Sequence, residues 1–267
     1  HRPPKPLYDA DDVERTLPLF TVVDFDTEVP FAPGLAVRLP TAGHILGSTS
    51  PVVSADSTSI GFSGDLGRPN HPLLRPPAPP PAAQALVVES TYGDRVHPPN
   101  PQDDLAAAIT RTIERSGSVV IPAFAVDRTE LLLLTLRDLI RAGRIPRVPI
   151  FVDSPMARNA TAIFVRHPEC FDAETGAMFA EGDGAPFGFN RLRYVGSADE
   201  SKALNDRTEP CIIISASGMA EGGNRHRIVE QRLALGQDRQ SLGGADVAED
   251  ADHRRRIGRR DDRAEQE

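Results

Sequence analysis

From residue 102 onward the sequence alternates apolar runs of strand length with longer segments of helical periodicity, and this alternation restricts the fold more than any other feature. Helices are predicted over 102–115 and 127–142, and strands over 118–121, 149–152 and 211–215. The second helix presents an apolar face made of Leu131, Leu132, Leu134, Leu136 and Leu139. Gly143 is predicted to end that helix, and Ser154 followed by Pro155 predicts the start of another. Strands that alternate with helices form a parallel sheet covered by helices, so an α/β domain is predicted here.

The first part of the chain has a different pattern. Residues 21–63 contain short apolar runs broken by Gly, Pro and Asp, which predicts strands of a layered sheet. Residues 69–81 contain seven prolines in thirteen positions, which excludes regular helix and predicts an extended connector. The connector leads into residues 85–88, predicted to be a buried strand that ends at the polar cluster 89–93. A chain of 267 residues therefore suits one or two domains.

Composition excludes several classes of protein. The net charge of −8 argues against a surface coated in basic residues for duplex nucleic acid, although a local basic groove stays possible. No apolar stretch approaches the roughly 20 residues that cross a bilayer, so no membrane partner is expected. Cys170 and Cys211 form no disulfide framework or zinc-ribbon spacing, which favours the cytoplasm. Residues 236–267 mix nine acids with seven arginines, without periodicity or aromatic residues, and are predicted to be a disordered tail.

Two residues have the surroundings expected of metal ligands. His44 lies between glycines just after a strand-like run, and Asp65 follows an apolar strand beside two glycines. Imidazole and carboxylate are both ligands that zinc accepts. Each residue also has an ordinary structural interpretation, His44 as a hydrogen-bonded histidine and Asp65 as a turn aspartate. Taken one at a time, the two segments leave both interpretations open.

Six segments together resemble one family. They are GHILGS at 43–48, SGDLGR at 63–68, VESTYGDR at 88–95, PAFAVDRTE at 122–130, VDSPMA at 152–157 and SASGMAEGG at 215–223. They occur in the order found in β-CASP nucleases of the metallo-β-lactamase fold, a family of RNA-processing hydrolases that includes bacterial ribonucleases and the nuclease of the cleavage and polyadenylation specificity factor. The resemblance extends from about residue 6 to about residue 235.

The resemblance implies a fold and an organisation. Residues 1–96 would form a partial metallo-β-lactamase αβ/βα sandwich, and residues 97–235 a β-CASP domain with a parallel sheet flanked by helices. Residues 236–267 would be a disordered tail unrelated to the family. The resemblance also implies hydrolysis of single-stranded RNA, with a homodimer as a possible assembly. RNA and DNA specialists share this fold, so the substrate rests on the resemblance alone.

The resemblance assigns roles to particular residues. The family uses two zinc ions to activate a water that attacks a phosphodiester. His44 would bind one zinc and Asp65 would bridge both, while Glu89 would act in catalysis by orienting a histidine that protonates the leaving oxygen. The structural alternative for Glu89 is a surface acid at a strand end.

Four further residues are candidates for phosphate binding. Ser215, Ser217 and Gly218 follow a strand in a turn of the kind that presents amides and hydroxyls to a phosphate, although a ligand-free turn is as ordinary. Arg128 opens the leucine-rich helix near its positive end, where either a phosphate or a neighbouring acid would be its partner. Family members usually carry glycine where Asp127 stands, and an acid there would oppose phosphate. Asp153 and Arg158 resemble structural supports of the family.

The family's histidine-rich zinc motif lies upstream of the matched segments, and further ligands and the proton donor lie downstream. Neither is present in these residues. Two ligands alone should hold zinc weakly or not at all, so the chain is expected to be an inactive fragment of a zinc-dependent ribonuclease. The alternatives are a non-catalytic nucleic-acid-binding remnant and another hydrolase of the same superfold.

Overall fold

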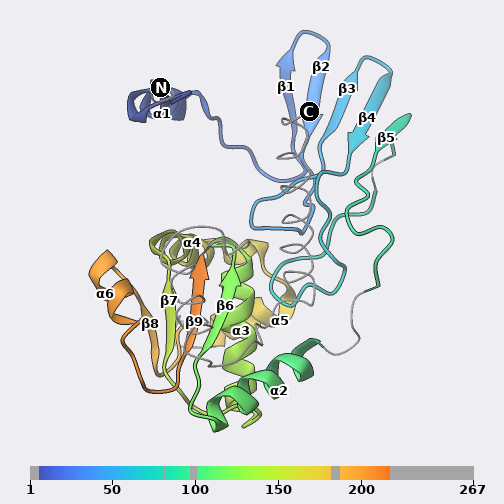
Figure 1. Ribbon diagram of the computed structural model, residues 1–267. Coiled ribbons are helices and arrows are strands. Elements are labelled where there is room, and N and C mark those ends of the chain that lie inside the picture. Colours follow the sequence, from blue (N-terminus) through green and yellow to red (C-terminus); the bar gives the residue numbers. More distant parts are fainter. Residues whose placement is uncertain (1–5, 81, 97–100, 182–186, 217–267) are drawn as a thin grey trace, which may run out of the picture. The chain divides into compact units, whose positions relative to one another are not determined.

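The computed structural model describes residues 6–80, 82–96, 101–181 and 187–216 (Figure 1). The chain divides into two compact units. The first consists of His1–His71 and Arg75–Gly93, and the second of Pro72–Leu74 and Asp94–Glu267. Both units contain a sheet, and helices accompany the parallel sheet of the second, which confirms the predicted α/β class.

The first unit is built on a five-stranded sheet in the order β1-β2-β3-β4-β5. Its strands are β1 (Glu28–Ala32), β2 (Leu35–Arg38), β3 (Val52–Ala55), β4 (Thr58–Phe62) and β5 (Ala85–Val87). The first four strands are antiparallel neighbours, and β5 runs parallel to β4 with Ile60 opposite Ala85. The helix α1 (Ala10–Thr16) and the 3-10 turn η1 (Leu17–Leu19) precede the sheet. Asp9 caps α1 by accepting the Asp12 N–H.

The strand predicted over residues 85–88 forms, but the prediction that it is buried is wrong. Leu86 is 47% exposed, and Val87 and Val88 are each 56% exposed. The reason is its position, because β5 lies at the edge of the sheet and β4 is its one neighbour among the described strands. Ile60 and Phe62 of β4 are also about 40% exposed. The described part of this unit therefore leaves much of the apolar surface of its last two strands open.

The second unit contains a parallel four-stranded sheet in the order β6-β9-β7-β8. Its strands are β6 (Val119–Ala123), β7 (Ile150–Asp153), β8 (Leu192–Tyr194) and β9 (Ile212–Ala216). Cys211 and the three isoleucines Ile212–Ile214 are at most 1% exposed. Such a continuous apolar run is typical of a strand covered on both faces. The core of this unit is therefore centred on β9, the last described strand in sequence but an inner strand of the sheet.

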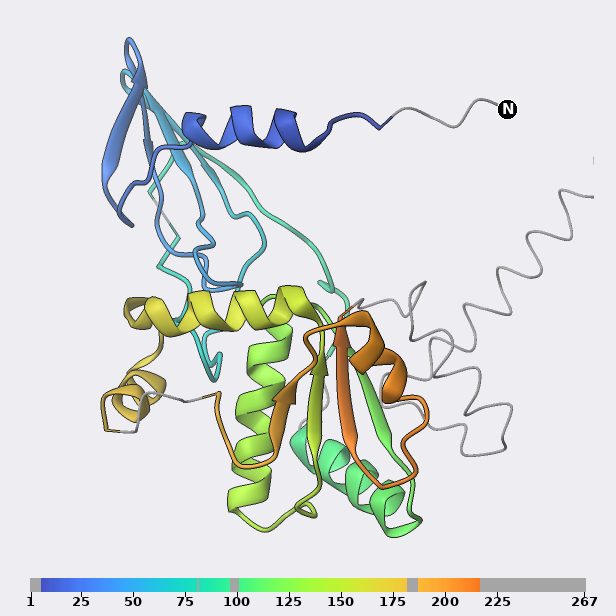
Figure 2. The same ribbon diagram turned by 90° about the vertical axis from the view of Figure 1, so that its left-hand side faces the viewer.

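The described residues of the second unit form five α-helices: α2 (Pro101–Glu114), α3 (Arg128–Arg141), α4 (Pro155–Arg166), α5 (Ala173–Glu181) and α6 (Ala198–Ala203), with a 3-10 turn η2 (Pro168–Cys170). The Ser154 hydroxyl caps α4 by accepting the Ala157 N–H at 3.1 Å, as predicted. Gly143 follows the end of α3 with φ of +67°, also as predicted. Figure 2 shows α4 running across the end at which α3 begins. The predicted apolar face needs one correction, because Leu133 is fully buried while Leu132 is only partly buried.

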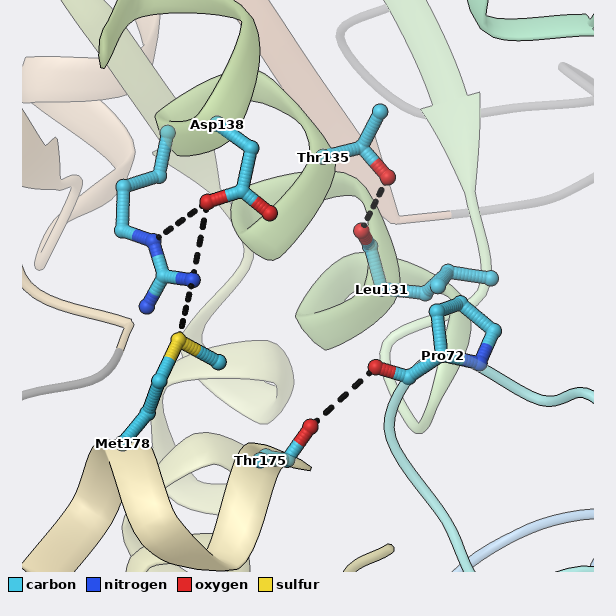
Figure 3. Close-up of polar contacts among 7 residues, drawn as sticks. Pro72, Leu131, Thr135, Asp138, Thr175 and Met178 are labelled. Carbon is cyan, nitrogen blue, oxygen red and sulfur yellow. Dashed lines mark hydrogen bonds and ion pairs between the residues drawn. The ribbon is translucent and has the colours of Figure 1, made fainter. Parts of the chain in front are cut away.

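A short piece of the proline-rich connector belongs to the second unit. Leu73 and Leu74 are 0% and 2% exposed, so this part of the connector is core rather than linker. The Thr175 hydroxyl in α5 donates to the Pro72 carbonyl at 3.2 Å (Figure 3). The Asp172 N–H donates to the Leu73 carbonyl at 3.1 Å. Beside it the buried Arg137 of α3 bonds Asp138 and the Met178 sulfur of α5. Composition alone did not show this insertion.

The predicted tail at residues 236–267 lies outside the described residues. Among the residues that are described, no helix is both long and apolar enough to span a membrane. Cys170 and Cys211 are both free thiols.

Candidate functional site

The two motif turns of the first unit are packed against each other through glycines. The His44 turn is closed by Ser48, whose hydroxyl accepts the N–H groups of His44 and Ile45 at 3.0 and 3.2 Å. The Asp65 turn is attached to it by the Gly67 N–H, which donates to the Ala42 carbonyl at 2.8 Å. A Cβ on Gly67 would lie 1.8 Å from the Gly43 oxygen, so no larger residue fits there. The glycines therefore fix where His44 and Asp65 lie.

These turns bring the two predicted metal ligands together. His44 Nε2 lies 4.0 Å from Asp65 Oδ2, and the two side chains are 43% and 74% exposed. Asp65 follows β4, and Gly64 before it has φ of +56°, a conformation that favours glycine. The pair is open to solvent and could be reached by an ion.

Glu89 holds the Asp65 turn in place. It follows β5, and its N–H donates to the Ser63 hydroxyl at 2.9 Å. Its carboxylate accepts the Leu66 N–H at 2.5 Å. The Leu66 N–H and then the Thr91 hydroxyl lower the pKa of Glu89, and the nearby His44 lowers it further. In this structure the charged Glu89 thus fixes the residue next to Asp65, a positioning role that the sequence motif did not specify.

The His44 and Asp65 side chains fit part of a zinc site. Zinc binds nitrogen and oxygen ligands at about 2.0–2.2 Å, so two ligand atoms of a tetrahedral site lie about 3.4 Å apart. A small side-chain rotation would bring the 4.0 Å pair to that separation. No cluster of three or more His, Cys, Asp or Glu side chains able to hold a metal occurs among the described residues. The described residues could thus supply two ligands of a four-coordinate zinc, and the remaining ligands would come from elsewhere.

The second candidate region is the carboxyl edge of the parallel sheet. Arg128, the first residue of α3, is exposed there. Ser215 is only 2% exposed, so its hydroxyl points into the domain rather than toward solvent. Ser217 and Gly218, the other predicted phosphate ligands, lie outside the described residues.

Asp127 occupies a strained turn at this edge. It has φ of 66° and ψ of −55°, and the Arg128 N–H donates to the Val126 carbonyl at 2.8 Å. These are the features of a γ-turn of the rare, strained kind, which glycine adopts more easily. The side chain is 6% exposed and is therefore turned inward. The expected conflict between this acid and a phosphate is reduced, because the carboxylate does not lie on the open surface.

Sequence reasoning missed a buried carboxyl group below this edge. Glu130 in the first turn of α3 is 0% exposed, and the Thr161 hydroxyl of α4 donates to its Oε1 at 2.8 Å. Burial raises the pKa of Glu130 to about 7, and the charge of Asp127 adds to the rise. Burial likewise raises the pKa of Tyr194, which lies close to Thr161 and Glu130. A signal existed, because Glu130 precedes Leu133 and Leu134 by three and four positions and so lies on the apolar face of the helix.

Comparisons with known proteins identify the family. Residues 129–240 match the family model described as the Beta-Casp domain. The chain is 32% identical over 238 residues to Ribonuclease TTHA0252 of Thermus thermophilus, covering 86% of this chain and 54% of the relative. It is 31% identical over 221 residues to an RNase J-like protein of Methanocaldococcus jannaschii, covering 81% and 50%. It is 32% identical over 223 residues to the transcription termination factor FttA of Methanosarcina mazei, covering 81% and 35%.

The matched domain and these relatives define a β-CASP protein of the metallo-β-lactamase fold, and the chain belongs to this family. The resemblance predicted from the six sequence segments is confirmed. The chain spans about half the length of the two relatives named as ribonucleases and about a third of the termination factor.

Proposed function

We propose that this chain is part of a zinc-dependent ribonuclease that hydrolyses RNA phosphodiester bonds, and that the 267 residues alone bind single-stranded RNA without cleaving it. The observation that carries the proposal is the 4.0 Å approach of His44 Nε2 and Asp65 Oδ2 on two turns joined by glycines. Two relatives named as ribonucleases support the choice of reaction. The proposal places the enzyme in the cytoplasm and does not require a homodimer.

In this proposal each described residue has a definite task. His44 and Asp65 bind metal, and Glu89 keeps the Asp65 turn in position through the Leu66 N–H. Arg128 binds a phosphate of the RNA, for which a guanidinium offers two parallel hydrogen bonds. A bound zinc would lower the pKa of its water and stabilise charge that develops on the phosphate.

The second candidate is that the longer protein to which this chain would belong also binds nucleic acid without cleaving it. It is favoured by the small number of metal ligands among the described residues, where His44 and Asp65 make two while a catalytic zinc normally has three protein ligands. Another hydrolase of the same superfold is the third candidate. The names of the relatives argue against it, since two are ribonucleases and the third acts in transcription termination.

Zinc affinity of the purified chain tests the metal assignment. Zinc would be titrated in competition with a chromogenic chelator, comparing the wild type with His44→Ala and Asp65→Asn. The matched control is His167→Ala, which removes another exposed histidine, 2.8 Å from a Glu169 carboxylate. Weak zinc binding that both site variants abolish and the control retains is the expected result. Equal zinc affinity in all four proteins would contradict the assignment.

RNA binding tests the other half of the proposal. A fluorescently labelled single-stranded RNA would be titrated with the wild-type chain, with and without a chelator. Binding that is independent of metal is expected, because Arg128 lies in the other unit from His44 and Asp65. An absence of RNA binding would refute the proposed function.

A further inference from the structure

We propose that the carboxyl edge of the β6-β9-β7-β8 sheet binds single-stranded RNA by stacking one unpaired base on the Phe124 ring, with Arg128 and Arg158 contacting the flanking phosphates. This inference rests on the proposed function and adds a binding residue and a mode of recognition to it. In open parallel sheets, ligands commonly bind outside the carboxyl ends of the strands.

Phe124 is held outward in a well-fixed backbone. It is the first residue after β6 and is 63% exposed, while its neighbours Ala123 and Ala125 are 2% and 8% exposed. The Thr129 hydroxyl donates to the Phe124 carbonyl at 2.8 Å, and the strained turn at Asp127 follows directly. A single exposed apolar residue is ordinary, but an exposed aromatic ring held in a fixed backbone beside further exposed apolar side chains calls for an explanation. Stacking with a ligand provides one.

Other exposed apolar side chains extend the same edge. Val126 follows Phe124 in the turn and is 39% exposed, and Met156 in the first turn of α4 is 66% exposed. The strands that lead to Phe124 and Met156, β6 and β7, lie on either side of β9. Strand neighbours are about 4.8 Å apart, so the ends of β6 and β7 are separated by about 10 Å. The exposed surface is thus wider than one side chain, and Phe124 is its aromatic member.

Positive charge adjoins this surface, where the half-buried Asp153 at the end of β7 accepts a hydrogen bond from the Ser201 hydroxyl at 2.8 Å. The hydrogen bond from Thr161 to Glu130 joins α4, which carries Arg158, to the first turn of α3, which carries Arg128. Both arginines are exposed, and neither forms an ion pair with an acid of the described residues. The acids closest in sequence to Arg128, Asp127 and Glu130, are 6% and 0% exposed and so do not line the surface. Guanidinium groups here would attract phosphate rather than acidic side chains.

An exposed aromatic ring together with exposed arginines favours single-stranded nucleic acid as the ligand of this edge. An exposed aromatic ring beside arginines is the arrangement that binds an unpaired base and its phosphates. In a duplex the base faces are already stacked, so an exposed ring cannot reach them. The preference should therefore be for single strands, with little dependence on base sequence, because every base offers a π-face.

The test measures polarisation of a fluorescein-labelled oligouridine with the full chain, at about 50 mM and 200 mM salt. Loss of base stacking in Phe124→Ala should weaken binding by about five-fold to a hundred-fold. Phe124→Tyr should bind like the wild type, since a phenol ring still stacks. Phe31→Ala, which removes a 56% exposed aromatic of the first unit, is the matched control and should change nothing. Arg128→Gln should reduce the salt slope by about one.

The outcomes separate this inference from the proposed function. Wild-type binding that Phe124→Ala leaves unchanged overturns the stacking role while the proposed function stands. Equal affinity for duplex and single-stranded RNA also overturns the stacking role. A wild-type chain that binds no RNA overturns the proposed function itself. If Phe124→Ala does not fold, Phe124→Leu is measured instead. Leucine keeps the apolar volume but has no ring for stacking, so the affinity should still fall by about ten-fold.

Discussion

The buried Glu130 makes the stability of the second unit depend on pH, and replacing it with glutamine should remove that dependence. Its side chain is 0% exposed, and burial raises its pKa from 4.5 to about 7. Glu130 therefore keeps its proton in the folded protein at pH values where the unfolded chain has lost it. Between pH 4.5 and 7 unfolding releases a proton, so the free energy of unfolding falls as pH rises.

The size of the effect follows from the two pKa values. A change from 4.5 to about 7 corresponds to about 3 kcal/mol at 1.36 kcal/mol for each factor of ten. The fall should begin near pH 4.5 and level off above about 7, where both states are ionised. Relative to a domain stability of about 5–15 kcal/mol, this is a large fraction.

Urea unfolding followed by circular dichroism at 222 nm measures the effect. All but one of the described α-helices lie in the second unit, so this signal reports mainly on it. The free energy of unfolding would be obtained by linear extrapolation at several pH values from 5 to 8, for the wild type and Glu130→Gln. The wild type should lose about 2–3 kcal/mol over this range, and the variant should lack that loss.

Glu114→Gln is the matched control, because Glu114 is an exposed helical glutamate of the same unit. It should keep the wild-type pH dependence. The same pH slope in Glu130→Gln and in the wild type would show that Glu130 is not held neutral by burial, and the reasoning would be refuted.

Three other substitutions test separate parts of the structure. Asp127→Gly should raise the free energy of unfolding by about 1 kcal/mol in the same urea assay, because it relieves a strained turn; a destabilised variant would contradict this. Leu73→Ala should lower stability by about 2–5 kcal/mol, since Leu73 is fully buried in the second unit, whereas Leu66→Ala, 41% exposed, should cost far less. Glu89→Gln should weaken zinc binding, because a neutral amide holds the Leu66 N–H less strongly; unchanged zinc affinity would count against the positioning role.

Much of the second unit could be predicted from the sequence because its signals are local. The leucine run of α3, the stop at Gly143 and the cap at Ser154 each depend on neighbouring residues, and all three are found in the structure. The burial of Ile212–Ile214 follows from an uninterrupted apolar run. The strand β8 (Leu192–Tyr194) was not predicted, since three residues with an arginine at the centre carry no clear periodicity.

The errors arise where burial depends on distant partners. Residues 85–87 are as apolar as a buried strand, yet they form an edge strand whose exposure depends on which elements pack beside it. Leu73 and Leu74 lie in a proline-rich run that looks like a connector, and their burial comes from contacts with α5 about a hundred residues later. Sequence pattern does not report such long-range contacts.

Part of the candidate site could be predicted from the sequence, because its turns depend on neighbouring residues. The glycines beside His44 and Asp65 signal tight turns, and the structure shows why glycine is needed where Gly67 meets Gly43. The Glu89 contact with Leu66 and the Glu130 contact with Thr161 join residues 23 and 31 positions apart, which no spacing rule indicates. The sequence contains these residues, but the role of each depends on a distant partner that the sequence pattern does not identify.

Cleavage of a labelled single-stranded RNA by the purified 267-residue chain, with zinc and with zinc plus chelator, tests the central proposal most directly. Two ligands 4.0 Å apart do not fix the coordination shell that a catalytic zinc requires. We therefore predict RNA binding without cleavage above background, whether or not zinc is present. Cleavage that the chelator abolishes and that His44→Ala also removes would show that these residues already form a complete site, and would contradict the account.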